Sequence, residues 1–78
     1  MNDRDYIPKK KLRELLRKIR KKAGVSQVTL ARQLARPQSF VSKYELGEKT
    51  LDFFELKEVC EALGISVLEF VKKLEKPQ

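Results

Sequence analysis

The chain has 78 residues but no histidine, no tryptophan and a single cysteine, Cys60. Without histidine and with only one thiol, the chain cannot assemble a zinc site from the usual ligands. A lone cysteine cannot close an internal disulfide, so nothing requires an oxidising compartment. No apolar run approaches the ~20 residues of a membrane-spanning helix, and the polar start of the chain carries no apolar signal segment. We therefore expect a cytoplasmic protein that holds no metal and no other cofactor.

The chemistry of an enzyme site is also missing from the sequence. There is no histidine to act as a general base, no glycine-rich phosphate loop and no clustered set of carboxylates. A helix lying on a membrane surface is disfavoured for the basic residues 8–23, because their apolar side chains are Leu and Ile without Trp or Phe anchors. We expect neither catalysis, nor a small-molecule substrate, nor a membrane partner.

The net charge of +7 is distributed unevenly along the chain. Residues 1–43 contain 13 Lys/Arg and 3 Asp/Glu, whereas residues 44–78 contain 5 and 8. Such asymmetry is typical of a chain whose first half binds a polyanion, and nucleic acid is the polyanion it favours. The alternative is that the lysine-rich stretch 9–22 is only a solvated helix face.

Glycines and capping motifs divide the chain into five helical segments. Gly24, Gly47 and Gly64 each follow a helical pattern, where a helix commonly ends on a left-handed residue. Asp52-x-x-Glu55 and Ser66-x-x-Glu69 resemble capping boxes at helix starts. The pattern predicts an all-α fold with helices over about Pro8–Ala23, Gln27–Leu34 after the N-cap Ser26, Pro37 or Gln38 to Leu46, Asp52–Leu63 and Val67–Glu75.

The second and third of these helices have the spacing of a helix-turn-helix. They are joined by a tight turn at Ala35–Pro37, and the small side chain of Ala31 permits a steep, close crossing. The apolar seam is expected from Leu30, Leu34, Val41 and Tyr44. The outward face of the third helix then carries side chains suited to base edges, namely Gln38, Ser39, Ser42 and Lys43.

Together these motifs resemble the phage-repressor/Cro-type (XRE) helix-turn-helix family from Leu12 to Leu74. The residues that carry the resemblance are Ser26-Gln27-x-x-Leu30-Ala31, Pro37 to Glu45 with Gly47, and Ala62-Leu63-Gly64-Ile65-Ser66. The resemblance implies a compact five-helix repressor-like bundle over residues 8–75, between a flexible N-terminus (1–7) and a C-terminal tail (76–78). It also implies a transcriptional regulator, expected to be a repressor, that binds palindromic double-stranded DNA as a homodimer with its third helix in the major groove. The alternative function is a protein-interaction module, such as the DNA-binding antitoxin of a toxin–antitoxin pair.

The resemblance also implies roles for individual residues. Gln27 would contact a phosphate and brace Gln38, which would read a base; the alternative is two ordinary polar residues at helix starts. Lys49 is the second residue assigned to phosphate. Arg20 and Glu45 would form a structural ion pair, the alternative being a solvated pair of little worth.

The interhelical turn departs from the family pattern, because Ala35 stands where the family usually has glycine. Ala35 either keeps a left-handed conformation at a cost of roughly 1–2 kcal/mol, or Pro37 has reshaped the turn by extending Arg36. The residues alone leave both open.

The last helix predicts a second subunit. Its apolar residues span about 160° of the helical wheel, more than a one-sided surface helix needs. We expect a dimer interface that uses Phe54, Phe70 and Leu74. Cys60, by contrast, is expected to be a core residue rather than a redox sensor.

Overall fold

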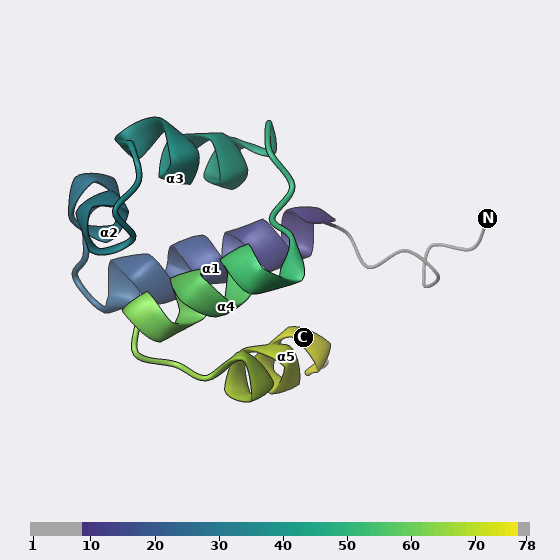
Figure 1. Ribbon diagram of the computed structural model, residues 1–78. Helices are drawn as coiled ribbons and strands as arrows, with labels where there is room; N and C mark the ends of the chain where they lie inside the picture. Colours follow the sequence, from purple (N-terminus) through teal and green to yellow (C-terminus); the bar gives the residue numbers. More distant parts are fainter. Residues whose placement is uncertain (1–8, 77–78) are drawn as a thin grey trace.

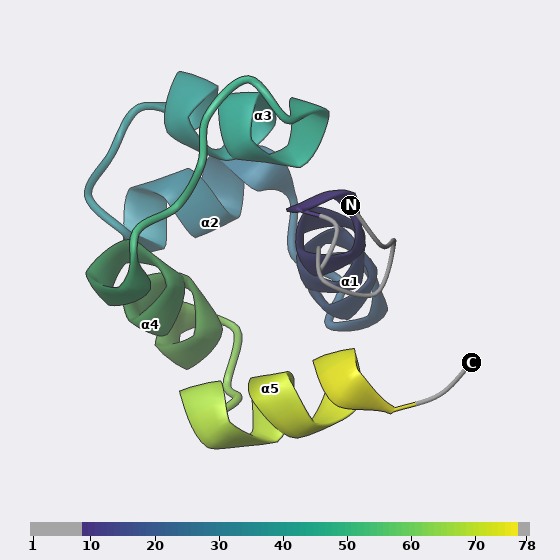
Figure 2. The ribbon, with the colours of Figure 1, turned by 90° about the vertical axis from the view of Figure 1, so that its right-hand side faces the viewer.

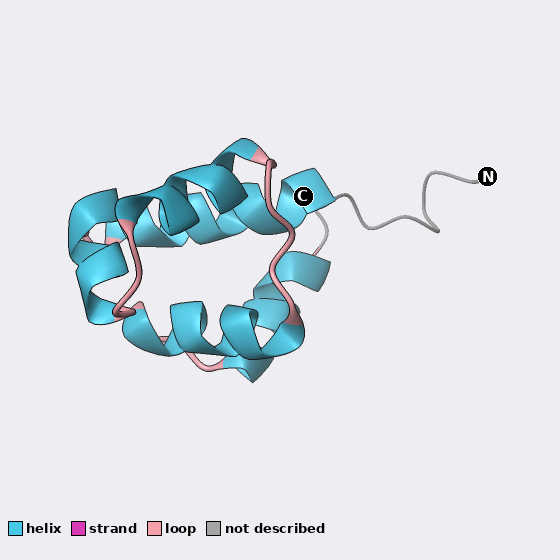
Figure 3. Cartoon of the chain, turned by 45° about the horizontal axis from the view of Figure 1, so that its top comes forward, coloured by secondary structure: helices cyan, strands magenta, loops and turns pink. Residues whose placement is uncertain are grey.

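The computed structural model describes residues 9–76, which form five α-helices joined by short loops (Figures 1 and 3). Described residues outside the helices lie in turns and loops, with no strand among them. The predicted all-α fold is confirmed, with helix bounds within one or two residues of those expected. Pro8 and the segments 1–7 and 77–78 lie outside the described residues. The helices are α1 (Lys9–Lys22), α2 (Gln27–Gln33), α3 (Gln38–Leu46), α4 (Phe53–Ala62) and α5 (Val67–Glu75).

Three helices start where a side chain satisfies the free backbone N–H groups of the first turn. Ser26 caps α2 by accepting a hydrogen bond from the Thr29 N–H at 3.0 Å. Full capping boxes open α4 and α5, with Glu55 and Glu69 each bonding back to the N-cap backbone. These contacts are local in sequence, which is why the capping motifs predicted the helix starts.

Four helices end in the same hydrogen-bond pattern, with a left-handed residue just beyond the last turn. After α3 that residue is Gly47, where φ is +85° and a Cβ would lie only 2.7 Å from the Cζ of Arg13. After α2 it is Ala35, with φ of +56°; the Ala35 N–H bonds to the Arg32 carbonyl and the next N–H to the Ala31 carbonyl. Of the two turn geometries left open by the sequence, the left-handed one is therefore observed.

The helices surround one core (Figure 2). Helices α2 and α3 lie on one side of the molecule and α5 on the opposite side, while α1 and α4 lie between them. Accordingly α1 packs against both α3 and α5, and α4 packs against both α2 and α5. The buried apolar side chains are Leu16, Leu30, Ala31, Phe40, Val41, Tyr44, Val59, Cys60, Phe70 and Leu74.

Two of the three side chains expected at the dimer interface lie on the inner face of α5. Phe70 is fully buried and Leu74 is 7% exposed, because both pack into the core of their own chain. Their assignment to a dimer surface is wrong for this reason. On α4 and α5 the large apolar side chains that stay exposed are Phe53 and Phe54 at the start of α4, and Leu68 and Val71 on α5; Val28 and Leu46 are exposed elsewhere.

Two structural features are absent from residues 9–76. None of the five helices is long and apolar enough to cross a membrane. Within residues 9–76, no three His, Cys, Asp or Glu side chains come together in a way that could hold a metal ion.

Candidate nucleic-acid interface

Helices α2 and α3 form the steeply crossed pair that the sequence predicts (Figure 1). Ala31 is 2% exposed at the crossing, and Leu30, Val41 and Tyr44 are buried on the same side of the pair. Because the inner face of α3 is fixed in this way, its opposite face must point away from the core.

That outward face is hydrophilic from Gln38 to Lys43, and the exposed Leu46 follows in the last turn of α3. Gln38, Ser39 and Lys43 are exposed, and Ser42 is half-buried. The Ser42 hydroxyl donates to the Ser39 carbonyl at 3.3 Å, so its lone pairs remain free to accept. We call these four residues the reading face. Their side chains supply donors and acceptors of several lengths on one exposed helix.

A chain of polar contacts connects the start of α3 to the interior. The guanidinium of Arg20 on α1 donates to both carboxylate oxygens of Glu45, from Nε at 2.7 Å and from Nη2 at 2.9 Å. Its Nη1 donates to the Val25 carbonyl at 2.8 Å. The Gln27 amide donates to Glu45 at 2.9 Å, and its carbonyl oxygen accepts from the Gln38 amide at 3.3 Å. Gln27 therefore lies between the ion pair and Gln38, in the bracing position that the resemblance implies.

The ion pair is almost completely removed from solvent, with side-chain exposures of 8% for Arg20 and 3% for Glu45. Burial is the largest influence on the Glu45 carboxyl and would raise its pKa. The hydrogen bonds from Arg20 and Gln27, with the Arg20 charge, outweigh burial and hold that pKa below its ordinary value. The bond to Glu45 raises the pKa of Arg20. Both groups are thus ionised, and the pair fixes α3 to α1.

A second polar cluster ties α3 to α4 from the other side. Oε2 of Glu55 lies 3.2 Å from the Lys49 ammonium and 3.6 Å from Nη1 of Arg36, whose Nη2 bonds to Glu58 at 3.0 Å. Both cations also lie over the Phe40 ring, with Arg36 Cζ at 4.5 Å and Lys49 Nζ at 5.5 Å from its centroid. Lys49, assigned to phosphate from the sequence, is therefore already held by a carboxylate.

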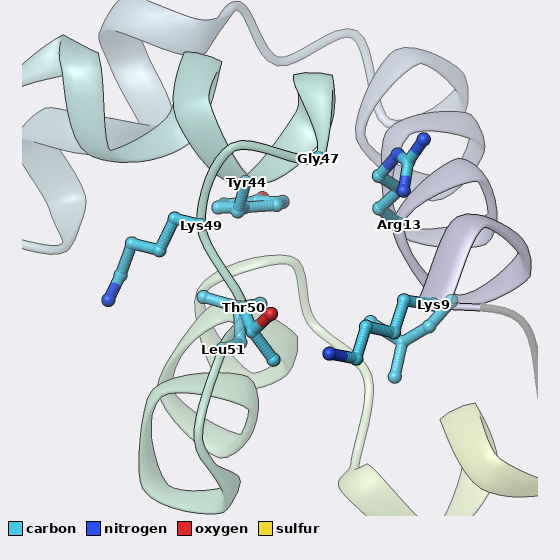
Figure 4. Close-up of a pocket in the computed structure, with 8 residues that line it drawn as sticks. Lys9, Arg13, Tyr44, Gly47, Lys49, Thr50 and Leu51 are labelled. Carbon is cyan, nitrogen blue, oxygen red and sulfur yellow. The ribbon is translucent and has the colours of Figure 1, made fainter.

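A shallow pocket opens between α1 and the loop that follows α3 (Figure 4). Lys9 and Arg13 reach it from α1, and the Arg13 guanidinium packs against Gly47. In Figure 4 the Lys49 side chain points away from these two, on the other side of the loop. Cations thus approach the end of α3 from both sides.

The sequence did not indicate the roles of three residues near α3. Arg36 stood out only as a departure from the family pattern, Glu55 only as a capping residue, and Arg13 not at all. The contacts of Arg36 and Lys49 with Glu55 join segments before and after α3, so no local motif could reveal them. The asymmetric charge was the one available signal.

The comparisons with known proteins agree with this geometry. A helix-turn-helix family model matches residues 16–70. No match was found among the curated proteins. A solved structure described as an XRE-family like protein from Pseudomonas syringae pv. tomato str. DC3000 is 42% identical and superposes with a TM-score of 0.82, covering 86% of this chain and 82% of that chain. The chain therefore belongs to the XRE-type helix-turn-helix family of DNA-binding transcription regulators.

Proposed function

We propose that this protein is a sequence-specific repressor that inserts α3 into the major groove of double-stranded DNA. The observation that carries the proposal is the reading face: four polar side chains on the exposed side of a helix whose other side is buried. A helix presented in this way fits the width of the major groove, where each base pair displays a distinct pattern of donors and acceptors.

The four residues have different reach. Gln38 at the first turn suits a bidentate contact with adenine, and its amide is already oriented by Gln27. Lys43 reaches guanine O6 and N7 further along the groove. Ser39 and Ser42 are shorter and serve bases or phosphates close to the helix.

Phosphate contacts are proposed on either side of the reading face. Gln27 at the start of α2 lies where exposed N–H groups and the helix dipole favour an anion. Lys49 lies in the loop after α3 and supplies a cation at its other end. Because phosphates carry no base information, these residues contribute affinity and orientation rather than sequence preference.

A homodimer on a palindromic operator completes the proposal. Phe54 is 75% exposed in the first turn of α4, shortly after the loop that ends α3. A second copy packed there would cover this side chain and bring the two α3 helices close enough for half-sites about 34 Å apart. Sedimentation should then show two copies of the chain bound to a two-site operator. Phe54→Ala should lower the fraction of operators that carry two copies. One copy per two-site operator would contradict the homodimer.

The decisive experiment is selection of bound duplexes from a random library, followed by affinity measurements at fixed salt. We expect the selected sequences to share a palindromic consensus. The full chain should bind this consensus with little loss of affinity when the salt is raised to the physiological concentration. Gln38→Ala and Lys43→Ala should each weaken binding to the consensus by about 1–3 kcal/mol and relax the preference at single positions. Gln27→Ala should weaken all sequences alike.

Lys57→Ala is the matched control, because Lys57 is an exposed lysine on α4 that pairs only with Glu61 in the described residues. It should leave the consensus unchanged. If the two reading-face variants also select the unchanged consensus, α3 is not the element that reads the DNA. No affinity for any duplex would instead favour a protein-interaction module.

A further inference from the structure

Two cations that flank the reading helix meet at one carboxylate. Arg36 comes just before α3 and Lys49 just after it, yet both side chains reach Oε2 of Glu55 on α4. The Phe40 ring lies beneath both cations and is 8% exposed, so it holds them against α4. The Glu55 side chain is only 15% exposed, whereas those of Arg36 and Lys49 are 35% and 34% exposed.

The carboxylate itself cannot easily move away. Its Oε1 accepts the Asp52 backbone N–H at 2.9 Å, and this bond is half of the capping box that starts α4. The cations, by contrast, have long side chains with free torsions and remain about one-third exposed. The fixed partner is therefore the anion, and the partners able to change are the two cations.

We propose that Glu55 is a positioning residue that competes with the DNA phosphates for Arg36 and Lys49. Without DNA, it keeps both cations beside the two ends of α3. On binding, the cations exchange this carboxylate for backbone phosphates while Glu55 keeps its capping bond. The proposal rests on the proposed DNA-binding function, and it adds a residue that limits affinity from a helix that need not touch DNA.

The exchange has a definite energetic sign. Each cation must give up a partly exposed ion pair before it contacts phosphate, and such pairs contribute up to about five-fold in an equilibrium constant. Removing the Glu55 charge releases Lys49 and leaves Arg36 held by Glu58 alone, so the competition weakens and binding should tighten. Because phosphates are the ligands gained, cognate and random duplexes should tighten by the same factor.

Glu55→Gln tests this, because glutamine at this position can still complete a capping box. We expect about two- to five-fold tighter binding of the full chain to both its selected consensus and a random duplex. The control is Glu69→Gln, since Glu69 occupies the same capping position on α5 and forms no ion pair with a Lys or Arg among the described residues. It should change the melting temperature only by the effect of the altered capping box, and it should leave affinity unchanged.

The same substitution in a second variant distinguishes competition for the two cations from a general effect of net charge. In the variant that carries Arg36→Gln and Lys49→Gln, adding Glu55→Gln should no longer raise affinity, because no cation is left to release. A general effect of charge would persist there and would overturn the proposal. Unchanged or weaker binding by Glu55→Gln alone would overturn it as well.

The two proposals fail in different ways. If the wild-type protein selects no consensus and binds no duplex, the proposed function fails and the Glu55 assignment falls with it. If the wild-type protein binds its consensus but Glu55→Gln binds no tighter, only the Glu55 assignment fails. A changed consensus in Glu55→Gln would also count against it, since cations that are released to bind phosphates do not alter the preference for bases.

Discussion

Replacing Ala35 by glycine should stabilise the protein. Ala35 is the only described non-glycine residue with positive φ, at +56°, and it occupies the position where three other helices of this chain have glycine. The backbone bonds around it, from the N–H groups of residues 35 and 36, require that conformation. The alanine therefore keeps a left-handed backbone because the helix end demands it.

The expected gain follows from two opposing terms. An L-residue in the left-handed region costs roughly 1–2 kcal/mol, a strain that glycine does not have. Glycine in turn costs about 0.5–1 kcal/mol because its unfolded chain is more flexible. Ala35 is exposed, so removing its methyl group sacrifices little packing. We expect Ala35→Gly to stabilise the protein by up to about 1 kcal/mol, and 1 kcal/mol corresponds to a rise of about 4–8 °C in melting temperature for a domain of this size.

Urea unfolding followed by circular dichroism measures the difference directly. Ala23→Gly is the matched control, since Ala23 is also an exposed alanine at a helix end but has negative φ. That variant should lose stability, because glycine there brings only its entropy cost. Equal destabilisation by Ala35→Gly and Ala23→Gly would refute the strain argument.

Four further predictions concern the buried side chains of Glu45, Tyr44 and Cys60. Glu45→Ala should cost about 3–5 kcal/mol in urea unfolding, because it leaves the charge of Arg20 buried and unpaired; Glu61→Ala, from an exposed pair, should cost under about 1 kcal/mol. Since the pKa of Glu45 is lowered, its contribution is present above its ordinary value of 4.5 and lost in acid, so the gap between wild type and Glu45→Ala should narrow in titrations below pH 4.5. Tyr44→Phe should leave the melting temperature unchanged or raise it, because the buried hydroxyl bonds to no other described residue; a large loss would reveal a partner for that hydroxyl. Burial raises the pKa of Cys60 to about 11 from 9.0, so wild-type stability should fall between pH 9 and 11 more steeply than that of Cys60→Ala.

Features encoded over a few residues could be predicted from the sequence. The capping boxes at Asp52 and Ser66 and the glycine ends gave the helix bounds, because each depends on backbone groups within one turn. The α2–α3 pair followed from Ala31 and the short turn for the same reason. Arg20 and Glu45 lie 25 residues apart, and only the family resemblance indicated that they meet.

Features that depend on which helix packs against which could not be predicted in this way. The apolar arc of α5 showed that it needs partners, but not that α1 and α4 cover the part with Phe70 and Leu74. Spacing alone therefore assigned two core residues to a dimer surface. The meeting of Arg36 and Lys49 at Glu55 is invisible to the sequence for a related reason, since it depends on how α4 is placed beside α3.

The separation of the two faces of α3 has a consequence for how new DNA targets arise. The buried side chains and the Glu45 contacts that hold α3 in place lie on the side of the helix opposite the reading face. Among the reading-face residues, only the side chain of Gln38 is connected to these contacts, through Gln27. Ser39 and Lys43 can therefore be exchanged for residues of other length or polarity with little effect on folding, as exposed positions usually allow. Under the proposed function, a lineage built on this scaffold would change its operator by substitutions at these positions while the supporting helices stay constant. Engineered libraries randomised there should yield folded proteins at high frequency.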